Sequence, residues 1–318
     1  MWVWRDPQQV TFQNPVVTLG FFDGVHLGHA QLLSQLRALG QELGRPTLAL
    51  TLWPHPRIVL GHDTGQFKLL NTLEYKSELM ASLGVDALLV LNFTLALAAL
   101  SPLAFLESLY ETLHPAAILM GYDHRFGHRG EGDFPLLKQF AERKGIRAYR
   151  GEPFAIDGVT VSSTRIRSTL LGGDMEGAAR LLGQDYGFWG TVVHGQQLGR
   201  TMGFPTANIQ PLSGWQLIPS HGVYAGHCLI PSLSPTRLRN ALINVGTRPT
   251  VDSQGRVSIE AYIPSLHTAI YNQRVFVSFR HKIRNELKFA TLDALRQQIE
   301  KDLAVLHDVA PPDDAALL

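Results

Sequence analysis

The chain has 318 residues, and its 28 lysine and arginine residues against 27 aspartate and glutamate residues give a net charge of +1 at neutral pH. This balance provides no overall field that would attract nucleic acid or an anionic membrane, so neither is expected as a partner. The single cysteine, Cys228, excludes an intrachain disulfide framework and a cysteine-based metal site. The length favours two domains.

The first half of the chain alternates between strand-like and helical segments. Apolar runs predict strands at 16–19, 47–52, 87–91 and 117–120. Helical spacing and capping signals predict helices at 29–39, 71–83, 102–113, 135–144, 164–171 and 174–182. Such alternation is typical of a doubly wound, parallel α/β sheet, in which ligands bind at the carboxyl ends of the strands.

The second half, after residue 185, has a different sequence pattern. Short β-rich runs at 188–195, 222–230, 237–246, 256–264 and 273–281 are separated by Gly, Pro, Ser and Asn. This pattern favours a small antiparallel β-barrel or sandwich. A final helix is predicted at 291–306 because leucine and isoleucine residues form one stripe along it.

The location of the protein is predicted from two segments. The N-terminal sequence MWVWRDPQQV does not have the charged start and apolar core of a signal peptide. The apolar run 86–100 is interrupted by Asn92 and Thr94, so it is too short for a membrane span. We therefore expect a cytoplasmic protein.

The segment GFFDGVHLGH, residues 20–29, connects the first predicted strand to a helix. Glycines let backbone approach a ligand closely, and a helix N-terminus attracts anions. The two histidines, His26 and His29, are spaced so that both lie on one face of the first helical turn. Glycine-rich turns also arise for steric reasons alone, but the combination with histidines and Asp23 favours a phosphate site.

A second polar cluster is VSSTRIR, residues 161–167. Its hydroxyl and guanidinium groups suit a polyphosphate, although a helix cap with solvated arginines is the simpler interpretation. A P-loop NTPase is excluded because the chain contains no Gly-Lys dipeptide, and the glycine spacing at 20–29 is not that of a dinucleotide-binding fingerprint. Together the two clusters resemble the two-sided clamp of nucleotidylyl transferases.

At the level of a family, the motifs GFFDGVHLGH, WPHPR, GYDHRFG and SSTRIR resemble the adenylyltransferase half of bacterial bifunctional riboflavin kinase/FMN adenylyltransferases. The segment GQQLGRTMGFPTANI, residues 195–209, resembles the flavokinase signature. The resemblance implies a nucleotidyltransferase-like FMN adenylyltransferase domain at 1–184 and a riboflavin kinase domain, a β-barrel with a C-terminal helix, at 185–318. It implies ATP as co-substrate, Mg²⁺, and riboflavin, FMN and FAD as substrates and products, and it is compatible with a homo-oligomer.

In the adenylyltransferase half, the resemblance implies that FMN attacks the α-phosphorus of ATP and expels pyrophosphate. The phosphate-binding residues would be Gly20, Phe22, Asp23, Gly24, His26, His29, Ser163, Thr164 and Arg167, with His26 and His29 as catalytic residues. The flavin or nucleotide pocket would involve His55, Asp123, Arg125 and Phe126, although His55 in its Pro-x-Pro turn also suits a structural cap.

In the kinase half, a phosphoryl group must pass to a primary alcohol, which requires a base, a metal ion and a phosphate loop. Glu260 is the expected base, and an outward-facing strand carboxylate is the structural alternative. Thr206 and Asn208 provide the hard oxygen atoms that Mg²⁺ prefers. The ATP-binding residues would be Gly195, Gly199, Arg200, Gly203, Thr206 and Asn208.

The sequence departs from the family pattern at Phe21, His124 and Tyr262, where Asn, Phe and His are frequent. One alternative is therefore a flavokinase whose adenylyltransferase half is impaired or inactive. Two others are a nucleotidylyltransferase that acts on another substrate and a flavin-binding protein without catalytic activity. FAD formation from FMN and ATP tests the first alternative, a riboflavin-dependent kinase assay tests the second, and the third would bind flavin without turnover in the presence of Mg²⁺ and ATP.

Overall fold

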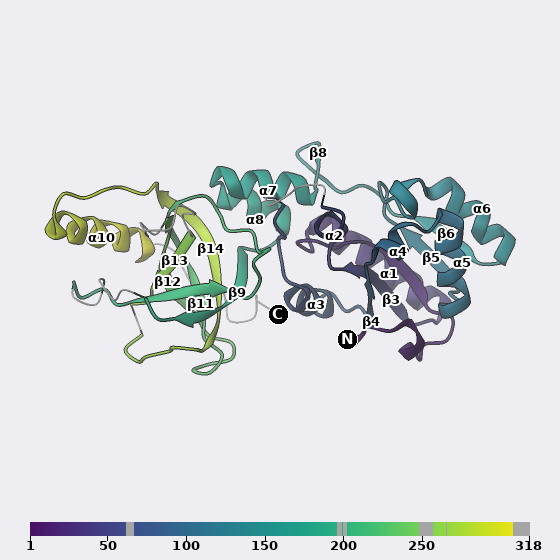
Figure 1. The fold of residues 1–318 in the computed structure, drawn as a ribbon, viewed down its shortest axis with the longest axis horizontal. Helices are drawn as coiled ribbons and strands as arrows, with labels where there is room; N and C mark the ends of the chain where they lie inside the picture. The colour runs from purple at the N-terminus through teal and green to yellow at the C-terminus, as the bar shows by residue number, and fades with distance from the viewer. Residues whose placement is uncertain (62–66, 196–198, 200–201, 248–256, 265, 308–318) are drawn as a thin grey trace. The chain divides into compact units, whose positions relative to one another are not determined.

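The computed structural model describes residues 1–61, 67–195, 199, 202–247, 257–264 and 266–307. By their contacts the residues form two compact units, one of residues 1–68 and 73–162 and the other of residues 69–72 and 163–318. Figure 1 colours the chain from the N-terminus to the C-terminus. Within the described ranges, no helix combines the length and the apolar character needed to span a bilayer.

The first unit is built on a six-stranded parallel sheet with the strand order β1-β4-β3-β2-β5-β6. Its strands are β1 (Trp2–Trp4), β2 (Val16–Leu19), β3 (Thr47–Trp53), β4 (Ala87–Asn92), β5 (Ala117–Met120) and β6 (Arg147–Arg150). Every residue of β2 and β5 is buried, as expected for strands covered on both faces. The predicted α/β class is confirmed, and the edge strands β1 and β6 are additions to it.

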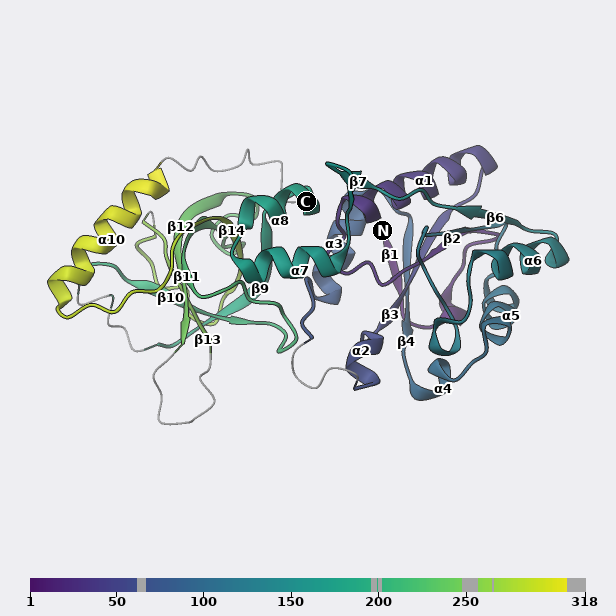
Figure 2. The same cartoon turned by 90° about the horizontal axis from the view of Figure 1, so that it is seen from above.

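Helices cover both faces of this sheet (Figure 2). They are α1 (Leu27–Leu43), α2 (Pro56–Val59), α3 (Leu73–Ser82), α4 (Leu95–Ala98), α5 (Pro102–Leu113) and α6 (Phe134–Lys144), with 3₁₀ turns η1 (Pro7–Gln9) and η2 (His128–Gly130) and a small hairpin of β7 (Ala155–Ile156) and β8 (Val159–Thr160). The start of α5 agrees with the prediction because the Ser101 side chain accepts a hydrogen bond from the Ala104 N–H at 3.2 Å, and proline is tolerated at the first helical position.

The topology of the sheet defines where a ligand fits. Strands β2 and β5 are neighbours, with Leu19 opposite Met120 at their carboxyl ends. After β2 the chain turns towards β3, and after β5 it turns the other way towards β6. The loops that follow β2 and β5 therefore border a crevice at the point where the strand order reverses, which is the usual ligand site of open α/β sheets.

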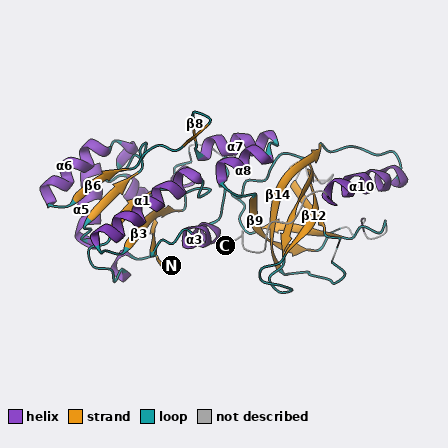
Figure 3. Ribbon diagram, turned by 180° about the vertical axis from the view of Figure 1, so that it is seen from behind, coloured by secondary structure: helices purple, strands orange, loops and turns teal. Residues whose placement is uncertain are grey.

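The second unit contains a closed antiparallel barrel, seen in orange in Figure 3. Its strands are β9 (Tyr186–Val193), β10 (Thr206–Pro211), β11 (Gly222–Leu229), β12 (Leu238–Thr247), β13 (Val257–Tyr262) and β14 (Arg274–Arg284). The fully buried ring of Phe279 contacts those of two other fully buried residues, Phe188 and Tyr224. The predicted antiparallel barrel is confirmed.

Three helices complete the second unit: α7 (Ser163–Gly172), α8 (Met175–Leu182) and α10 (Leu292–His307). Helix α8 packs on β9 and β14, and α10 covers part of the outer face of the barrel through Leu306. The predicted C-terminal helix is thus confirmed. Because α7 and α8 pack with the barrel, the compact units divide between residues 162 and 163. The boundary of the two activities at residue 184 stays a prediction.

Candidate functional site

The segment 20–29, called here the histidine loop, carries unusual backbone conformations. Phe22 and Val25 have φ angles of 49° and 41°, and Gly24 has a φ of 87°. The left-handed region is unfavourable for residues with a side chain, and strain of this kind concentrates at functional sites. A Cβ atom on Gly20 would lie 2.8 Å from the ring of Phe22, so glycine is needed there to let that ring fold back.

The two histidines of the loop lie against each other. His26 caps α1, because its Nδ1 accepts a hydrogen bond from the backbone N–H of His29 at 3.3 Å. Since Nδ1 is the acceptor, the proton of the neutral ring lies on Nε2, which is therefore a donor. The two rings stack with centroids 3.7 Å apart. Gly28 leaves room for the His26 ring, whose atoms would lie 3.3 Å from a Cβ at that position.

His29 is kept neutral by its surroundings. Burial lowers the pKa of His29 well below its usual value, and His26, Lys76 and His124 lower it further. The residue is partly accessible, but its Nδ1 is shielded from solvent and has no hydrogen-bond partner among the described residues. A buried polar atom of this kind normally finds a partner. We infer that a bound ligand supplies it.

Other predicted residues form the surroundings of the loop. The ring of His55 lies between Phe21 and Phe67, with both centroid distances at 4.8 Å. His55 also caps α2 by accepting a hydrogen bond from the Arg57 N–H at 3.2 Å. Both interpretations of His55, pocket wall and helix cap, are therefore compatible with its place. Burial lowers the pKa of His124, whose ring lies 6.1 Å from that of Phe21, to about 4.

The segment after β5 separates its predicted residues. Asp123 is exposed, and Arg125 is also exposed and lies 3.7 Å from Asp133. Phe126 is buried in the main core of the unit, where its ring lies 6.1 Å from that of Phe105. Asp123 and Arg125 thus face solvent beside the crevice, whereas Phe126 supports it from below.

An apolar cavity of about 340 Å³ lies between the sheet and α5. Its apolar wall includes Leu50, Leu89, Leu97, Phe105 and Leu109, and its charged and polar lining residues are Arg5, Asp6, Asn92, Ser108 and Thr112. A volume above 300 Å³ with mainly apolar walls and a few polar groups is typical of small-molecule sites. No sequence pattern predicts this cavity, because most of its apolar walls come from residues that such a pattern assigns to the core.

The predicted phosphate residues of the second cluster lie on the first turns of α7, in the second unit. Ser163 and Arg167 are half-buried, and Thr164 is exposed. Their joint action with the histidine loop stays a prediction.

In the second unit, one row of side chains follows the strand register around the barrel. Asn208 lies opposite Glu260, and Glu260 lies opposite Asn244. Directly opposite residues point to the same face of a sheet. Tyr262, two residues along β13, packs with α10, so this row lies on the outer face of the barrel. The Thr206 hydroxyl donates a hydrogen bond to Glu260 Oε2 at 3.1 Å.

The structure therefore brings Thr206, Asn208 and Glu260 together. Glu260 is half-buried rather than fully solvated, and Asn208 is 7% exposed. Thr206 and Asn208 lie on β10, and their side chains share one face of that strand. This placement fixes both oxygen-bearing side chains beside the carboxylate.

The structure explains why glycine occupies several positions of the predicted phosphate loop. A Cβ on Gly195 would lie 2.1 Å from Asn208 Nδ2, so glycine is required to make room for that amide. The Gly199 carbonyl accepts backbone hydrogen bonds from Met202 and Phe204, and Gly203 has a φ of 86°. Arg200 lies outside the described residues.

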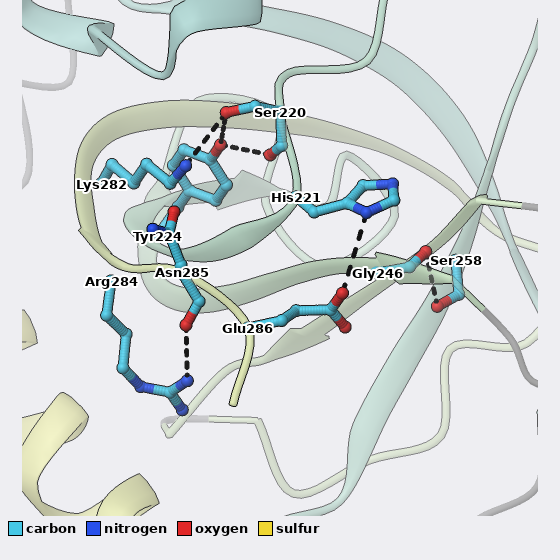
Figure 4. Close-up of polar contacts among 9 residues, drawn as sticks. All are labelled: Ser220, His221, Tyr224, Gly246, Ser258, Lys282, Arg284, Asn285 and Glu286. Atoms are coloured by element: carbon cyan, nitrogen blue, oxygen red, sulfur yellow. Dashed lines mark hydrogen bonds and ion pairs between the residues drawn. The ribbon is translucent and has the colours of Figure 1, made fainter. Parts of the chain in front are cut away.

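A polar network, shown in Figure 4, holds the segment that follows β14 against the neighbouring strands. The Glu286 carboxylate lies 3.8 Å from His221 Nδ1, and a Cβ on Gly246 would meet it at 2.1 Å. Lys282 donates to the Ser220 hydroxyl at 3.1 Å. Gly246 leaves room for the Glu286 carboxylate, and Ser220 accepts a hydrogen bond from Lys282. The end of β14 and the residues that follow it are therefore held close to neighbouring segments. None of these residues was predicted as functional.

Comparisons with known proteins agree with both halves. The FAD synthetase family model matches residues 8–165, and the riboflavin kinase model matches residues 182–310. A bifunctional riboflavin kinase/FMN adenylyltransferase of Listeria monocytogenes is 39% identical over 290 residues, which cover 91% of this chain and 90% of the relative. The chain belongs to this bifunctional family. It produces FMN and FAD as a riboflavin kinase and an FMN adenylyltransferase.

Further relatives support the same assignment. The Escherichia coli K12 enzyme of this name is 37% identical over 295 residues, which cover 92% of each chain. A solved structure from Streptococcus pneumoniae, described as a macrolide-efflux protein, has a TM-score of 0.87 and 27% identity over 97% of this chain and 99% of that chain. The family resemblance expected from the sequence motifs is confirmed.

Proposed function

We propose that the histidine loop binds the phosphates of ATP during FAD formation. The observation that supports this most directly is the shielded Nδ1 of His29, which has no hydrogen-bond partner among the described residues and belongs to a ring stacked on that of His26. In the reaction, a phosphate oxygen of FMN bonds to the α-phosphorus of ATP, and the bond from that phosphorus to the bridging oxygen breaks as pyrophosphate leaves. The nucleophile is already ionised, so positioning and charge stabilisation suffice.

The remaining residues of the adenylyltransferase site have supporting roles in this proposal. Asp23, Gly20, Gly24 and the ring of Phe22 shape the histidine loop. Ser163, Thr164 and Arg167 hold the departing pyrophosphate. The flavin or nucleotide would contact His55, Asp123, Arg125 and Phe126, of which His55 lies against Phe21 of the histidine loop.

In the kinase half, Glu260 accepts the proton of the riboflavin primary hydroxyl while the γ-phosphoryl group of ATP is transferred and ADP leaves. The hydrogen bond from Thr206 orients its carboxylate. Gly195, Gly199 and Gly203 contribute to phosphate binding in this proposal, and Arg200, which lies outside the described residues, adds positive charge.

Magnesium fits the donor set of this half. Three oxygen-bearing side chains, Thr206, Asn208 and Glu260, converge on one face of β10 and β13, and such hard oxygen atoms are the ligands Mg²⁺ prefers. Thr206 and Asn208 would hold the ion. When bound, it would neutralise phosphate charge. In the described part of the chain, no cluster of three or more His, Cys, Asp or Glu residues suggests a different metal.

A pair of variants tests the assignment in the full-length protein. His29→Ala is expected to lower FAD formation from FMN and ATP by about 10²–10³-fold, with riboflavin phosphorylation unchanged. Glu260→Gln keeps an acceptor for the Thr206 hydroxyl but cannot take a proton, so phosphorylation should fall by about 10²–10⁴-fold while FAD formation from added FMN stays normal.

Phosphorylation is scored as the sum of FMN and FAD, resolved by chromatography, because the second activity consumes the first product. The activity that each variant is expected to keep shows that the unit without the substitution is folded in that variant. Normal FAD output from His29→Ala would remove the histidine loop from the mechanism, and a wild-type protein that makes only FMN would establish the alternative of an inactive adenylyltransferase half. Cytoplasmic location is a further proposal, supported by the family's small soluble substrates, and homo-oligomerisation stays a prediction.

A further inference from the structure

Lys76, on α3, is a buried lysine that neither the sequence motifs nor the proposed mechanism uses. Lys76 is only 3% exposed to solvent. Lysine is almost never fully buried unless its charge has a partner. Its position therefore requires an explanation.

The ammonium group of Lys76 reaches the histidine loop. Nζ donates a hydrogen bond to the backbone oxygen of Phe21 at 2.6 Å. An ammonium has three donors, and in the ranges that the structure describes Phe21 is the one hydrogen-bond acceptor that Lys76 reaches. The Phe21 oxygen also accepts a hydrogen bond from the hydroxyl of the fully buried Thr51 at 3.2 Å. The loop is thus held at this carbonyl without Lys76.

The charge environment of Lys76 is that of an incomplete site. Burial lowers the pKa of Lys76 to about 8, and the buried Asp23 is the group that raises it again. Lys76 is also close enough to His29 to help keep that ring neutral. Lys76 Nζ also lies 5.8 Å from the centroid of the Trp53 ring, but a ring face carries no full negative charge, so the buried ammonium is unfavourable in the absence of further negative charge.

We propose that Lys76 is a further catalytic residue of FAD formation, and that its ammonium group neutralises the negative charge of the phosphates held by the histidine loop. This inference rests on the proposed role of that loop. As the FMN oxygen bonds to the α-phosphorus and the bond to the leaving pyrophosphate breaks, negative charge moves onto the pyrophosphate oxygens. Lys76 stabilises that charge and keeps its own protons.

The test measures steady-state FAD formation from added FMN and ATP with the full-length protein. Lys76→Met removes the charge at similar volume, and Lys76→Gln removes the charge but retains an N–H donor. Both are expected to lower kcat by about 10²–10³-fold, with the KM values for FMN and ATP within a few-fold, because the lost interaction acts on the transition state. Lys138→Met, at an exposed position of α6, is the matched control and should behave as wild type.

Two further readouts separate this inference from a structural role. Riboflavin phosphorylation, carried out by the other unit, should be unchanged in every variant. The first unit of Lys76→Met should be at least as resistant to unfolding as that of wild type, since a costly buried charge is gone. A kcat within threefold of wild type in either variant, or a loss of activity that follows a loss of stability, would overturn the inference. If His29→Ala abolishes FAD formation and Lys76→Met does not, only the role of Lys76 fails.

Discussion

The burial of Lys76 predicts an unusual dependence of stability on pH. Its pKa falls from 10.5 to about 8 on folding, and a tenfold change in proton affinity corresponds to about 1.4 kcal/mol. Below pH 8 the unfolded and folded chains both carry the charge, so the folded state bears the whole cost, about 3 kcal/mol. Between pH 8 and 10.5 the unfolded state binds more protons, so stability rises with pH and the cost fades.

The substitution Lys76→Met removes this cost together with one hydrogen bond, which is worth about 1 kcal/mol net. The Phe21 carbonyl keeps its bond from Thr51, so no buried acceptor loses its last partner. We therefore expect the first unit to gain about 2 kcal/mol at pH 7. Near pH 9.5 the remaining cost is only about 1.5 kcal/mol, and the gain should almost vanish.

Hydrogen exchange measured by mass spectrometry in increasing urea follows the first unit separately, through peptides from the buried strands β2 and β3. Following these peptides separately is necessary because a single unfolding midpoint is not well defined for a chain with two compact units. The difference between variant and wild type isolates Lys76 from the other groups that titrate in alkali. The reasoning is wrong if Lys76→Met destabilises the first unit at pH 7, or if the difference is the same at pH 7 and pH 9.5.

Three predictions concern the second unit. Asp302, 2% exposed, pairs with Arg284 at 2.7 Å, so Asp302→Ala should destabilise this unit by about 3 kcal/mol in urea unfolding, whereas Asp293→Ala at the exposed start of α10 should change little. Gly195→Ala should displace Asn208 and lower riboflavin phosphorylation at least about tenfold, with FAD formation and the Gly214→Ala control unaffected. A fragment of residues 184–318 is expected to fold and phosphorylate riboflavin, but it lacks α8, which packs on β9 and β14. A fragment that starts at residue 163 should therefore unfold at a higher urea concentration. Equal unfolding midpoints for the two fragments would refute this.

Much of the fold follows from local sequence. The buried strands of the sheet are continuous apolar runs, and helices such as α5 begin at recognisable caps. The edge strands β1 and β6 were missed because β1 is only three residues long and β6 begins and ends with an exposed arginine, and only pairing with β4 and β5 makes them strands. Tertiary pairing outweighs intrinsic preference in such short segments.

The candidate sites were predictable where a motif is contiguous. The histidine loop is one run of residues, whereas the row of Asn208, Glu260 and Asn244 depends on a strand register that no local pattern encodes. The sequence contains a signal for Lys76. It occupies the buried stripe of α3 three residues after Leu73 and three before Leu79, and a charged residue at an apolar position of a helix deserves a functional hypothesis.

The two sites differ in charge because their nucleophiles differ. The primary alcohol of riboflavin must lose a proton, so the kinase half needs a carboxylate that solvent and substrate can reach, and Glu260 is half-buried on the outer face of the barrel. The phosphate of FMN is already an anion and needs no carboxylate base, and the carboxylate of the loop, Asp23, lies close enough to Lys76 to favour its charged form. A shielded site with neutral histidine donors and one buried ammonium is better suited to that reaction, since charge interactions strengthen where water is excluded. Adding a base to the histidine loop should therefore slow FAD formation, and His29→Glu is expected to be less active than His29→Ala.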